Sequence, residues 1–248
     1  MSCVRQLLKA ELLKIRTART TWVLLGLMAF VLVVIVVLTL SSLDADELAG
    51  ADGIRRVLTI GGSIGCFFTL ALGILGMAGE YRHGTLGPAL VAAPSRWPAI
   101  TAKLLAHAVA GLGFGLVALV VTFTAGVPGL KAEDTSVSLT DSLPLTIMLG
   151  TLLAAALFAV IGVGLAALLR DQALALGAGL GWTLLADSLV MGLVPEAGRF
   201  LPGGTVTSLL RSQTDDVLPA GFAALLLVAY ALAFAAAGIV AVRRRDLT

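Results

Sequence analysis

The chain has 248 residues, of which 58% are hydrophobic and only 13% are charged, and its formal net charge is +2. An ordinary soluble domain carries about a quarter charged residues, so this composition excludes a water-soluble globular protein. The net charge is too small to indicate a nucleic-acid partner.

Residues 4–19 precede the first apolar run and have the pattern of an interfacial helix. Val4, Leu8, Leu12 and Ile15 recur at helical spacing, and basic residues occupy the remaining faces. This pattern predicts a helix lying flat in the headgroup layer of a membrane. The alternative is a basic flank that only fixes the orientation of the first span. That span is too long for a cleavable signal sequence, so we expect it to be retained.

Six apolar runs of 19 to 25 residues fill most of the chain, at 22–40, 58–79, 104–127, 145–169, 173–194 and 218–242. A helix rises about 1.5 Å per residue and the hydrocarbon core is about 30 Å thick, so about 20 apolar residues cross it. The runs lack the alternation typical of a membrane barrel. We therefore predict an all-α membrane protein with six transmembrane helices, in one domain spanning residues 1–248 of a chain embedded in the lipid bilayer.

The distribution of Lys and Arg predicts the orientation. With the N-terminus in the cytoplasm, 12 of the 17 basic residues fall on the cytoplasmic side and five outside. The positive-inside rule then places both termini in the cytoplasm, in agreement with the even number of spans. Arg exceeding Lys in an Ala- and Gly-rich chain suggests a bacterium, and hence the bacterial plasma membrane.

The cytoplasmic stretch 80–98 differs from the other connections because it concentrates polar, aromatic and proline residues. It begins with Glu80, Tyr81, Arg82, His83, Gly84 and Thr85. The link 170–172 is much shorter and predicts a tight helical hairpin. The extracytoplasmic stretch 195–217 is too apolar for a solvent loop, so we expect a re-entrant segment that dips into the outer leaflet.

Three pairs of glycines four residues apart indicate close helix packing, at 61 and 65, 111 and 115, and 177 and 181. They are compatible with packing within one chain or with a subunit interface. The two cysteines, Cys3 and Cys66, are expected in the cytoplasm and the membrane, and form no disulfide framework.

Catalytic and nucleotide-binding motifs are missing from the sequence. There is no phosphate-binding P-loop, no His or Cys spacing that suits a metal, and no set of Ser, His and acid for hydrolysis. His107, near the start of the third run, is expected to be a hydrogen-bonded interfacial histidine. We therefore expect no catalytic residue and no metal site.

Asp187 is the one acid inside an apolar run. It lies 16 residues beyond Asp171, about 24 Å along a helix, which places it in the outer leaflet. A carboxylate inside a membrane costs about 2.5 to 3.5 kcal/mol and is a functional candidate. A structural role, by pairing with Arg199 or capping backbone in the re-entrant segment, and a role toward a substrate or a proton both stay open.

The Glu80 to Thr85 stretch resembles the E-x-x-x-G-T signature of the type-2 permease subunits of ATP-binding-cassette (ABC) exporters. Three further segments are similar to that family. They are the N-terminal part with Glu11, Lys14 and Arg16, which resembles the family's elbow helix, the Phe200 to Gly204 piece, and the basic C-terminus Arg243 to Asp246.

The resemblance implies a permease whose ATPase is a separate chain, so that ATP and Mg²⁺ bind to the partner and no cofactor binds here. It implies a coupling helix after the second span, where Glu80 and Arg82 form hydrogen bonds with the ATPase, Tyr81 packs against it and Gly84 ends the helix. A solvated loop is the alternative. It also implies a dimer with the same or a paralogous permease subunit.

The substrate is open. Short outer loops favour a small drug, antibiotic, peptide or lipid-like molecule, as in multidrug efflux. Two other functions are compatible with the sequence. An ion-coupled carrier needs titratable groups at mid-membrane, and a non-transporting anchor or sensor would use the 80–98 stretch to bind another cytoplasmic protein.

Overall fold

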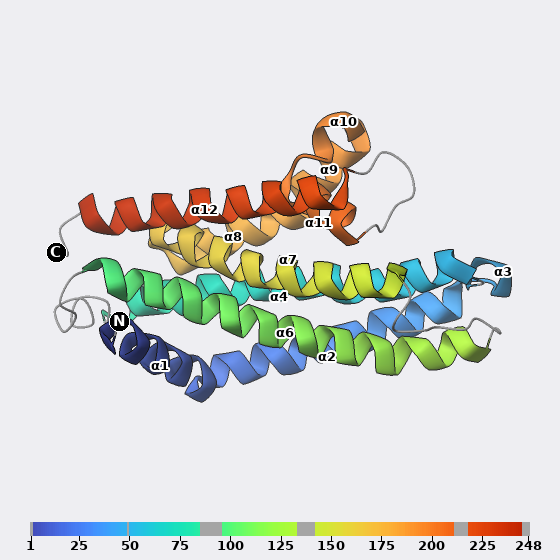
Figure 1. Ribbon diagram of the computed structural model, residues 1–248, viewed down its shortest axis with the longest axis horizontal. Helices are drawn as coiled ribbons and strands as arrows, with labels where there is room; N and C mark the ends of the chain where they lie inside the picture. The colour runs from blue at the N-terminus through green and yellow to red at the C-terminus, as the bar shows by residue number, and fades with distance from the viewer. Residues whose placement is uncertain (1, 49, 85–95, 133–141, 211–217, 245–248) are drawn as a thin grey trace.

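The structure is a computed structural model that describes residues 2–48, 50–84, 96–132, 142–210 and 218–244 (Figure 1). Every regular element in these ranges is helical. The elements are α1 (Ser2–Thr17), α2 (Arg19–Ser42), α3 (Ala45–Leu48), α4 (Gly50–Arg82), α6 (Arg96–Ala132), α7 (Ser142–Leu169), α8 (Gln172–Gly181), the π-helix η1 (Trp182–Ala186), α9 (Asp187–Leu193), α10 (Pro195–Gly198), α11 (Pro202–Leu210) and α12 (Ala220–Arg244).

Six helical stretches in the described residues are long and apolar enough to cross a membrane, which confirms the predicted all-α fold with six spans. The fifth of them, Gln172–Leu193, is made of α8, η1 and α9 in succession. The second is longer than its apolar run because α4 already begins at Gly50 and includes Arg55 and Arg56. That all six belong to one domain stays a prediction.

The first two helices are separated by a sharp bend at Ala18. Its backbone is extended, with φ −69° and ψ 124°, so the helical hydrogen bonding of α1 cannot continue into α2. The indole nitrogen of Trp22 donates to the carbonyl of Arg16 at 2.8 Å and fixes the bend from the α2 side. As a result α1 runs at an angle to α2 and packs against α6 (Figure 1). That α1 lies in the headgroup layer stays a prediction.

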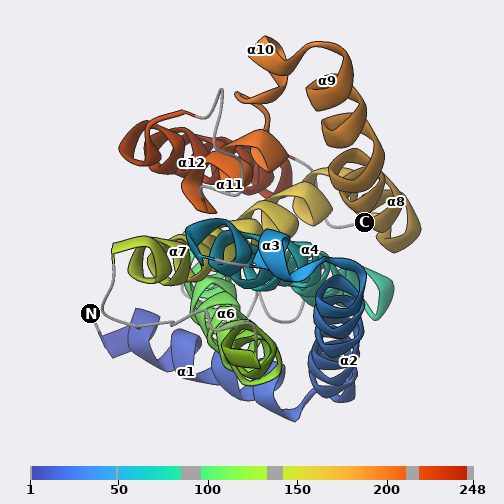
Figure 2. The ribbon, with the colours of Figure 1, turned by 90° about the vertical axis from the view of Figure 1, so that its right-hand side faces the viewer.

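The core lies along α4 and α7, which pack closely at the centre of the bundle. Figure 2 shows them between α6 and α2 on one side and α8 and α12 on the other. Gly73 of α4 faces the backbone of Ala159, and Gly162 of α7 faces the backbone of Leu70, so a Cβ at either glycine would overlap main-chain atoms. Close backbone approach of this kind is how small residues hold membrane helices together.

The three glycine pairs found in the sequence behave differently. The pair at 61 and 65 lies against Ala118 of α6, and the pair at 111 and 115 lies against Ala155 of α7. Both therefore serve packing within the chain. The third pair is Gly177 and Gly181 on α8. A Cβ added at either position would meet no neighbouring atom of the described structure within 4 Å.

The two termini lie at the same end of the bundle, which we call the terminus end (Figure 1). The end of α4 and the start of α8 lie there as well, and α3 lies at the opposite end, the far end (Figure 1). Near the start of α12, α11 is a short buried helix that packs against α12, α7, α4 and α9. The hydroxyl of Tyr230 on α12 donates to the carbonyl of Phe200 at 3.0 Å and holds the segment in place. That it re-enters the outer leaflet stays a prediction.

Candidate functional site

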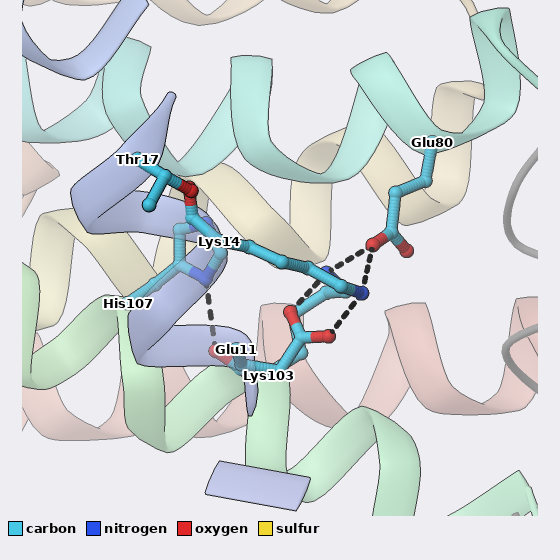
Figure 3. A network of polar contacts seen from close by, with 6 residues as sticks. All are labelled: Glu11, Lys14, Thr17, Glu80, Lys103 and His107. Atoms are coloured by element: carbon cyan, nitrogen blue, oxygen red, sulfur yellow. Dashed lines mark hydrogen bonds and ion pairs between the residues drawn. The ribbon is translucent and has the colours of Figure 1, made fainter. Parts of the chain in front are cut away.

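Four charged side chains from three helices form a closed ring of ion pairs at the terminus end. Glu11 and Lys14 come from α1, Glu80 from α4 and Lys103 from α6 (Figure 3). The ammonium of Lys103 lies 2.5 Å from Glu11 Oε2 and 2.9 Å from Glu80 Oε1. The ammonium of Lys14 lies 2.6 Å from Glu11 Oε1 and 3.1 Å from Glu80 Oε1. Each lysine thus bridges both carboxylates, and the ring is electrically neutral.

Local helix geometry brings these groups together. Glu11 and Lys14 are three residues apart, so they lie on the same face of α1. Glu80 lies two residues before the end of α4, and Lys103 lies in the second turn of α6. Long side chains at these positions reach across the space between the helix ends. The ring therefore joins α1 to the end of the second span and the start of the third.

Three of the four groups are largely removed from solvent. The side chain of Lys103 is 7% exposed and those of Glu11 and Glu80 are 12% exposed, whereas Lys14 is 52% exposed. A buried charge is tolerated only when it is paired and hydrogen-bonded, and removal of one partner leaves another charge uncompensated. Each buried group of the ring has two partners of opposite sign, and Glu80 Oε2 is the ring oxygen that is buried without a hydrogen-bond partner among the described residues.

The pairing keeps the α1 groups charged. Burial by itself raises the pKa of the Glu11 carboxyl, but the charge and hydrogen bonds of Lys103 and Lys14 outweigh it and hold that pKa below its usual 4.5. Burial lowers the pKa of Lys14, but the hydrogen bond to Glu11 and the charge of Glu80 outweigh it and hold that pKa above its usual 10.5. Both groups are ionised throughout the neutral range.

His107 lies one turn beyond Lys103 on α6 and is 1% exposed. Its Nδ1 lies 2.9 Å from the carbonyl of Lys103, so Nδ1–H is the donor and Nε2 carries the lone pair. Nε2 is buried, has no hydrogen-bond partner among the described residues, and points at Gly76 of α4, where a Cβ would overlap the imidazole. His107 therefore fills the contact between α4 and α6 directly beside the ring.

A cavity of about 560 Å³ opens beside the ring. It is lined by ring residues together with His107, Arg82 and Gln172, and by the bend between α1 and α2. Polar groups of α1 and of the spans that contain α2, α4, α6 and α8 therefore line one cavity at the terminus end.

The remaining motif residues at the end of α4 divide into two sets. Tyr81 is half-buried, and the guanidinium of Arg170 lies 5.6 Å from its ring centroid. Arg82 and His83 are exposed, and Arg82 Nη1 lies 3.5 Å from the Gln172 side-chain oxygen. Gly84 has φ 64°, in the left-handed region that favours glycine, and follows the last turn of α4.

Glu80 thus faces its neighbours in the bundle, and Arg82 to Gly84 form the exposed turn. Thr85 and the rest of the predicted coupling helix up to residue 95 lie outside the described residues. Arg16 is exposed on α1, and its carbonyl accepts the Trp22 hydrogen bond. The basic C-terminus falls mostly beyond the described side chains. Contact of any of these residues with an ATPase stays a prediction.

Sequence reasoning did not find the role of Lys103. In the sequence, Lys103 is one of the 12 basic residues that fall on the predicted cytoplasmic side. The available signal was its position directly before an uninterrupted apolar run, where a lysine requires a carboxylate on another helix.

Asp187 begins α9 directly after the π-helix and is 3% exposed. Its Oδ2 accepts a hydrogen bond from the backbone N–H of Gly203 at 2.8 Å, so it joins the fifth span to the start of α11. Among the described residues no ion pair joins it to Arg199, whose guanidinium lies 5.2 Å from the Phe200 ring centroid. Of the two structural contacts considered, the structure shows the backbone hydrogen bond.

Comparison with protein families gives a match over nearly the whole chain. Residues 5–247 match the family described as ABC-2 family transporter protein. No curated protein matches the chain.

Proposed function

The chain belongs to the ABC-2 transporter family as a membrane-spanning permease subunit, and we propose that it forms the substrate path of an ATP-driven exporter. The family implies a partner ABC ATPase and a lipid bilayer as surroundings. We place ATP and Mg²⁺ on that partner, and assign this chain the transport path and the transmission of movement. The setting is a bacterial plasma membrane with both termini in the cytoplasm.

The ring of ion pairs supports this proposal best. The segment that leads to the predicted coupling helix leaves the end of α4 at Arg82, two residues after Glu80, and the chain returns in α6, which carries Lys103. Glu80 therefore ties the departing end to α1 and α6 within one turn, and Lys103 ties the returning end to α1 and α4 about two turns into α6. A push from an ATPase on this segment would move three helices as a unit instead of bending one loop.

The exposed turn gives the partner a contact surface. Arg82 and His83 are exposed, and guanidinium groups form strong hydrogen bonds with carboxylates. Glu80 and Tyr81 hold the turn from behind through the ring and the Arg170 contact. We therefore divide the motif into a docking part, Arg82 to Gly84, and an anchoring part.

A dimer is supported by the open face of the fifth span. Gly177 and Gly181 form a small-residue pair with nothing packed on them in the described structure. Large apolar side chains of the same span, such as Leu174, Leu185 and Leu189, are exposed. A second permease subunit, identical or paralogous, would bring a helix against this face.

Two measurements test the function. The tagged chain is purified from its native membranes with cytoplasmic proteins retained, and we expect an ATPase of the size of one P-loop domain to co-purify. Arg82→Glu should abolish this co-purification while the chain remains folded. Arg56→Glu is the matched control, because that side chain is also exposed but lies near the opposite end of α4.

The outcomes separate the alternatives. ATP-dependent uptake of substrate into inverted vesicles that contain the chain and its ATPase supports the exporter. Transport by the chain alone under an ion gradient would replace it with a secondary carrier. A bound cytoplasmic protein without ATPase activity and without transport would indicate an anchor or sensor subunit.

A further inference from the structure

A second cavity, of about 450 Å³, lies between α2, α4 and α7 on one side and η1, α9 and α11 on the other. The aromatic residues Phe67, Phe68 and Phe158 and the thioether of Met191 line it, together with hydroxyl side chains and Asp187. Its volume is within the range of small-molecule sites, which are mostly apolar with a few fixed polar groups. The ring of ion pairs and the exposed turn at the end of α4 do not involve this cavity.

Asp187 leaves half of its carboxylate unused in this cavity. Oδ2 is bound to the N–H of Gly203, whereas Oδ1 is buried and has no hydrogen-bond partner among the described residues. The indole of Trp182 lies near the carboxylate without a hydrogen bond of standard geometry. Asp187 also takes part in none of the ion pairs between described side chains. A buried carboxylate in this state lacks a cationic partner.

The backbone around Asp187 is shaped to present it. The turn before it is π-helical, and the N–H of Asp187 donates to the carbonyl of Trp182, five residues earlier. Such wide turns are rare and are frequent at functional sites. Gly203 has no Cβ, and a Cβ there would overlap the Asp187 carboxylate. The sequence thus holds Oδ2 on the backbone of Gly203 and places Asp187 in the lining of the cavity.

The cavity chemistry selects the ligand class. Three phenylalanines and a methionine line the same cavity as the carboxylate, and Phe67 and Phe68 form an edge-to-face pair with ring centroids 5.7 Å apart. Aromatic rings attract cations, and they also bury apolar ligand surface. A carboxylate without a cationic partner repels anions. The wall is mostly apolar, which favours a ligand with an apolar body over a bare inorganic ion.

We propose that this cavity is the substrate site and that it takes an organic cation with an apolar body, held by the Asp187 carboxylate and the phenylalanine rings. That the bound cation is a transported substrate rests on the proposed export function. Binding of the cation to this cavity does not require an ATPase.

The test uses two rigid ions of matched size and opposite charge, tetraphenylphosphonium and tetraphenylborate. Equilibrium binding of each is measured to the purified full chain in nanodiscs, with empty nanodiscs subtracted. We expect saturable binding of tetraphenylphosphonium only. Asp187→Asn keeps the oxygen that accepts from Gly203 and removes the charge, so it should weaken phosphonium binding by about tenfold or more.

Phe67→Ala is the second variant and should weaken phosphonium binding several-fold, because a cation–π contact is worth about 1 kcal/mol. If Asp187→Asn does not fold, Phe67→Ala is the deciding variant. Phe67 is only half-buried, so we expect the chain to fold without its ring. Equal binding of both ions, unchanged phosphonium affinity in folded Asp187→Asn, or unchanged affinity in Phe67→Ala would each overturn the proposal. Phosphonium binding without ATP-driven transport would uphold the site and refute the exporter. Transport of a substrate without phosphonium binding would do the reverse.

Discussion

Substitution of Lys103 by Met tests the ring of ion pairs most directly. Met keeps most of the length and the apolar stem of lysine but removes the ammonium that lies 2.5 Å from Glu11 and 2.9 Å from Glu80. The two carboxylates, each 12% exposed, then share only Lys14. Loss of one partner of a buried pair costs about 3 to 5 kcal/mol, and retention of Lys14 places the expected loss near the lower figure.

The assay is thermal unfolding of the purified chain in detergent, followed by tryptophan fluorescence. For a chain of this size about 3 kcal/mol corresponds to a decrease in Tm of about 6 to 12 °C on the scale of soluble domains. Glu80→Gln in the Lys103→Met background removes the uncompensated carboxylate and should recover part of the loss. Arg56→Met, which breaks an exposed pair with Glu47, is the control and should change Tm by only about 1 to 2 °C.

A Tm for Lys103→Met within that control range would refute the reasoning. So would a double variant that is less stable than Lys103→Met, because it would show that Glu80 gains nothing from losing its charge. Either result would mean that the ring is held by the packing around it and contributes no stability of its own.

Two further predictions follow from the same region. Glu11 has a lowered pKa, so its contribution is present above pH 4.5 and is lost as the pH falls through the lower, folded value; Lys14 has a raised pKa, so its contribution is present below pH 10.5 and is lost as the pH rises through the higher, folded value. We expect a Tm plateau between these limits, and Glu11→Gln should flatten the acid side relative to the wild type; an unchanged acid side would contradict the pairing. Gly76→Ala should destabilise the chain by about 1 to 3 kcal/mol because its Cβ meets the His107 imidazole, and His107→Ala in the same chain should relieve the overlap. If Gly76→Ala matches the wild type in Tm, α4 and α6 are not in contact there.

The six spans could be predicted from the sequence because length and hydropathy alone decide whether a helix can cross a membrane. The direction in which a single charged side chain points could not be predicted from the sequence. Glu80 lies at the end of an apolar run, where it can face a partner protein, headgroups or a neighbouring helix, and only the placement of α1 and α6 shows which groups it meets. Lys103 is 23 residues away in sequence and Glu11 is 69 residues away, so no local pattern relates them.

The fifth span shows the same limit at the backbone level. Its apolar run indicates one continuous helix, but the structure widens five residues, Trp182–Ala186, into a π-helix directly before Asp187. Nothing in the side chains of that segment distinguishes a π-turn from an α-turn. The sequence therefore identified Asp187 as exceptional, whereas its hydrogen bond to Gly203 and the free Oδ1 required the fold of α11.

The ring of ion pairs and the second cavity, which contains Asp187, are connected by one helix, α4. Phe68 and Glu80 are both on α4, twelve residues and so about 18 Å apart, and α4 is continuous between them. A helix that moves as a rod when its end is pushed would shift Phe68 against η1 and α9, so ATP-driven movement at the ring would alter the proposed cation site.

If the two sites are coupled through α4, a variant of the ring should lose the stimulation of ATP hydrolysis by a bound cation but keep the affinity for that cation. In the wild type, tetraphenylphosphonium should raise the ATP hydrolysis rate of the assembled transporter. In Lys103→Met, whose α4 end is no longer held to α1 and α6 in the same way, that stimulation should fall severalfold, while phosphonium affinity stays within about twofold because Lys103 does not line the cavity. Both quantities are measured on one preparation at a temperature well below the Tm of the variant. Full stimulation in Lys103→Met would show that α4 transmits the movement without the ring, and a parallel loss of affinity would show that the variant disturbs the whole bundle instead of its coupling.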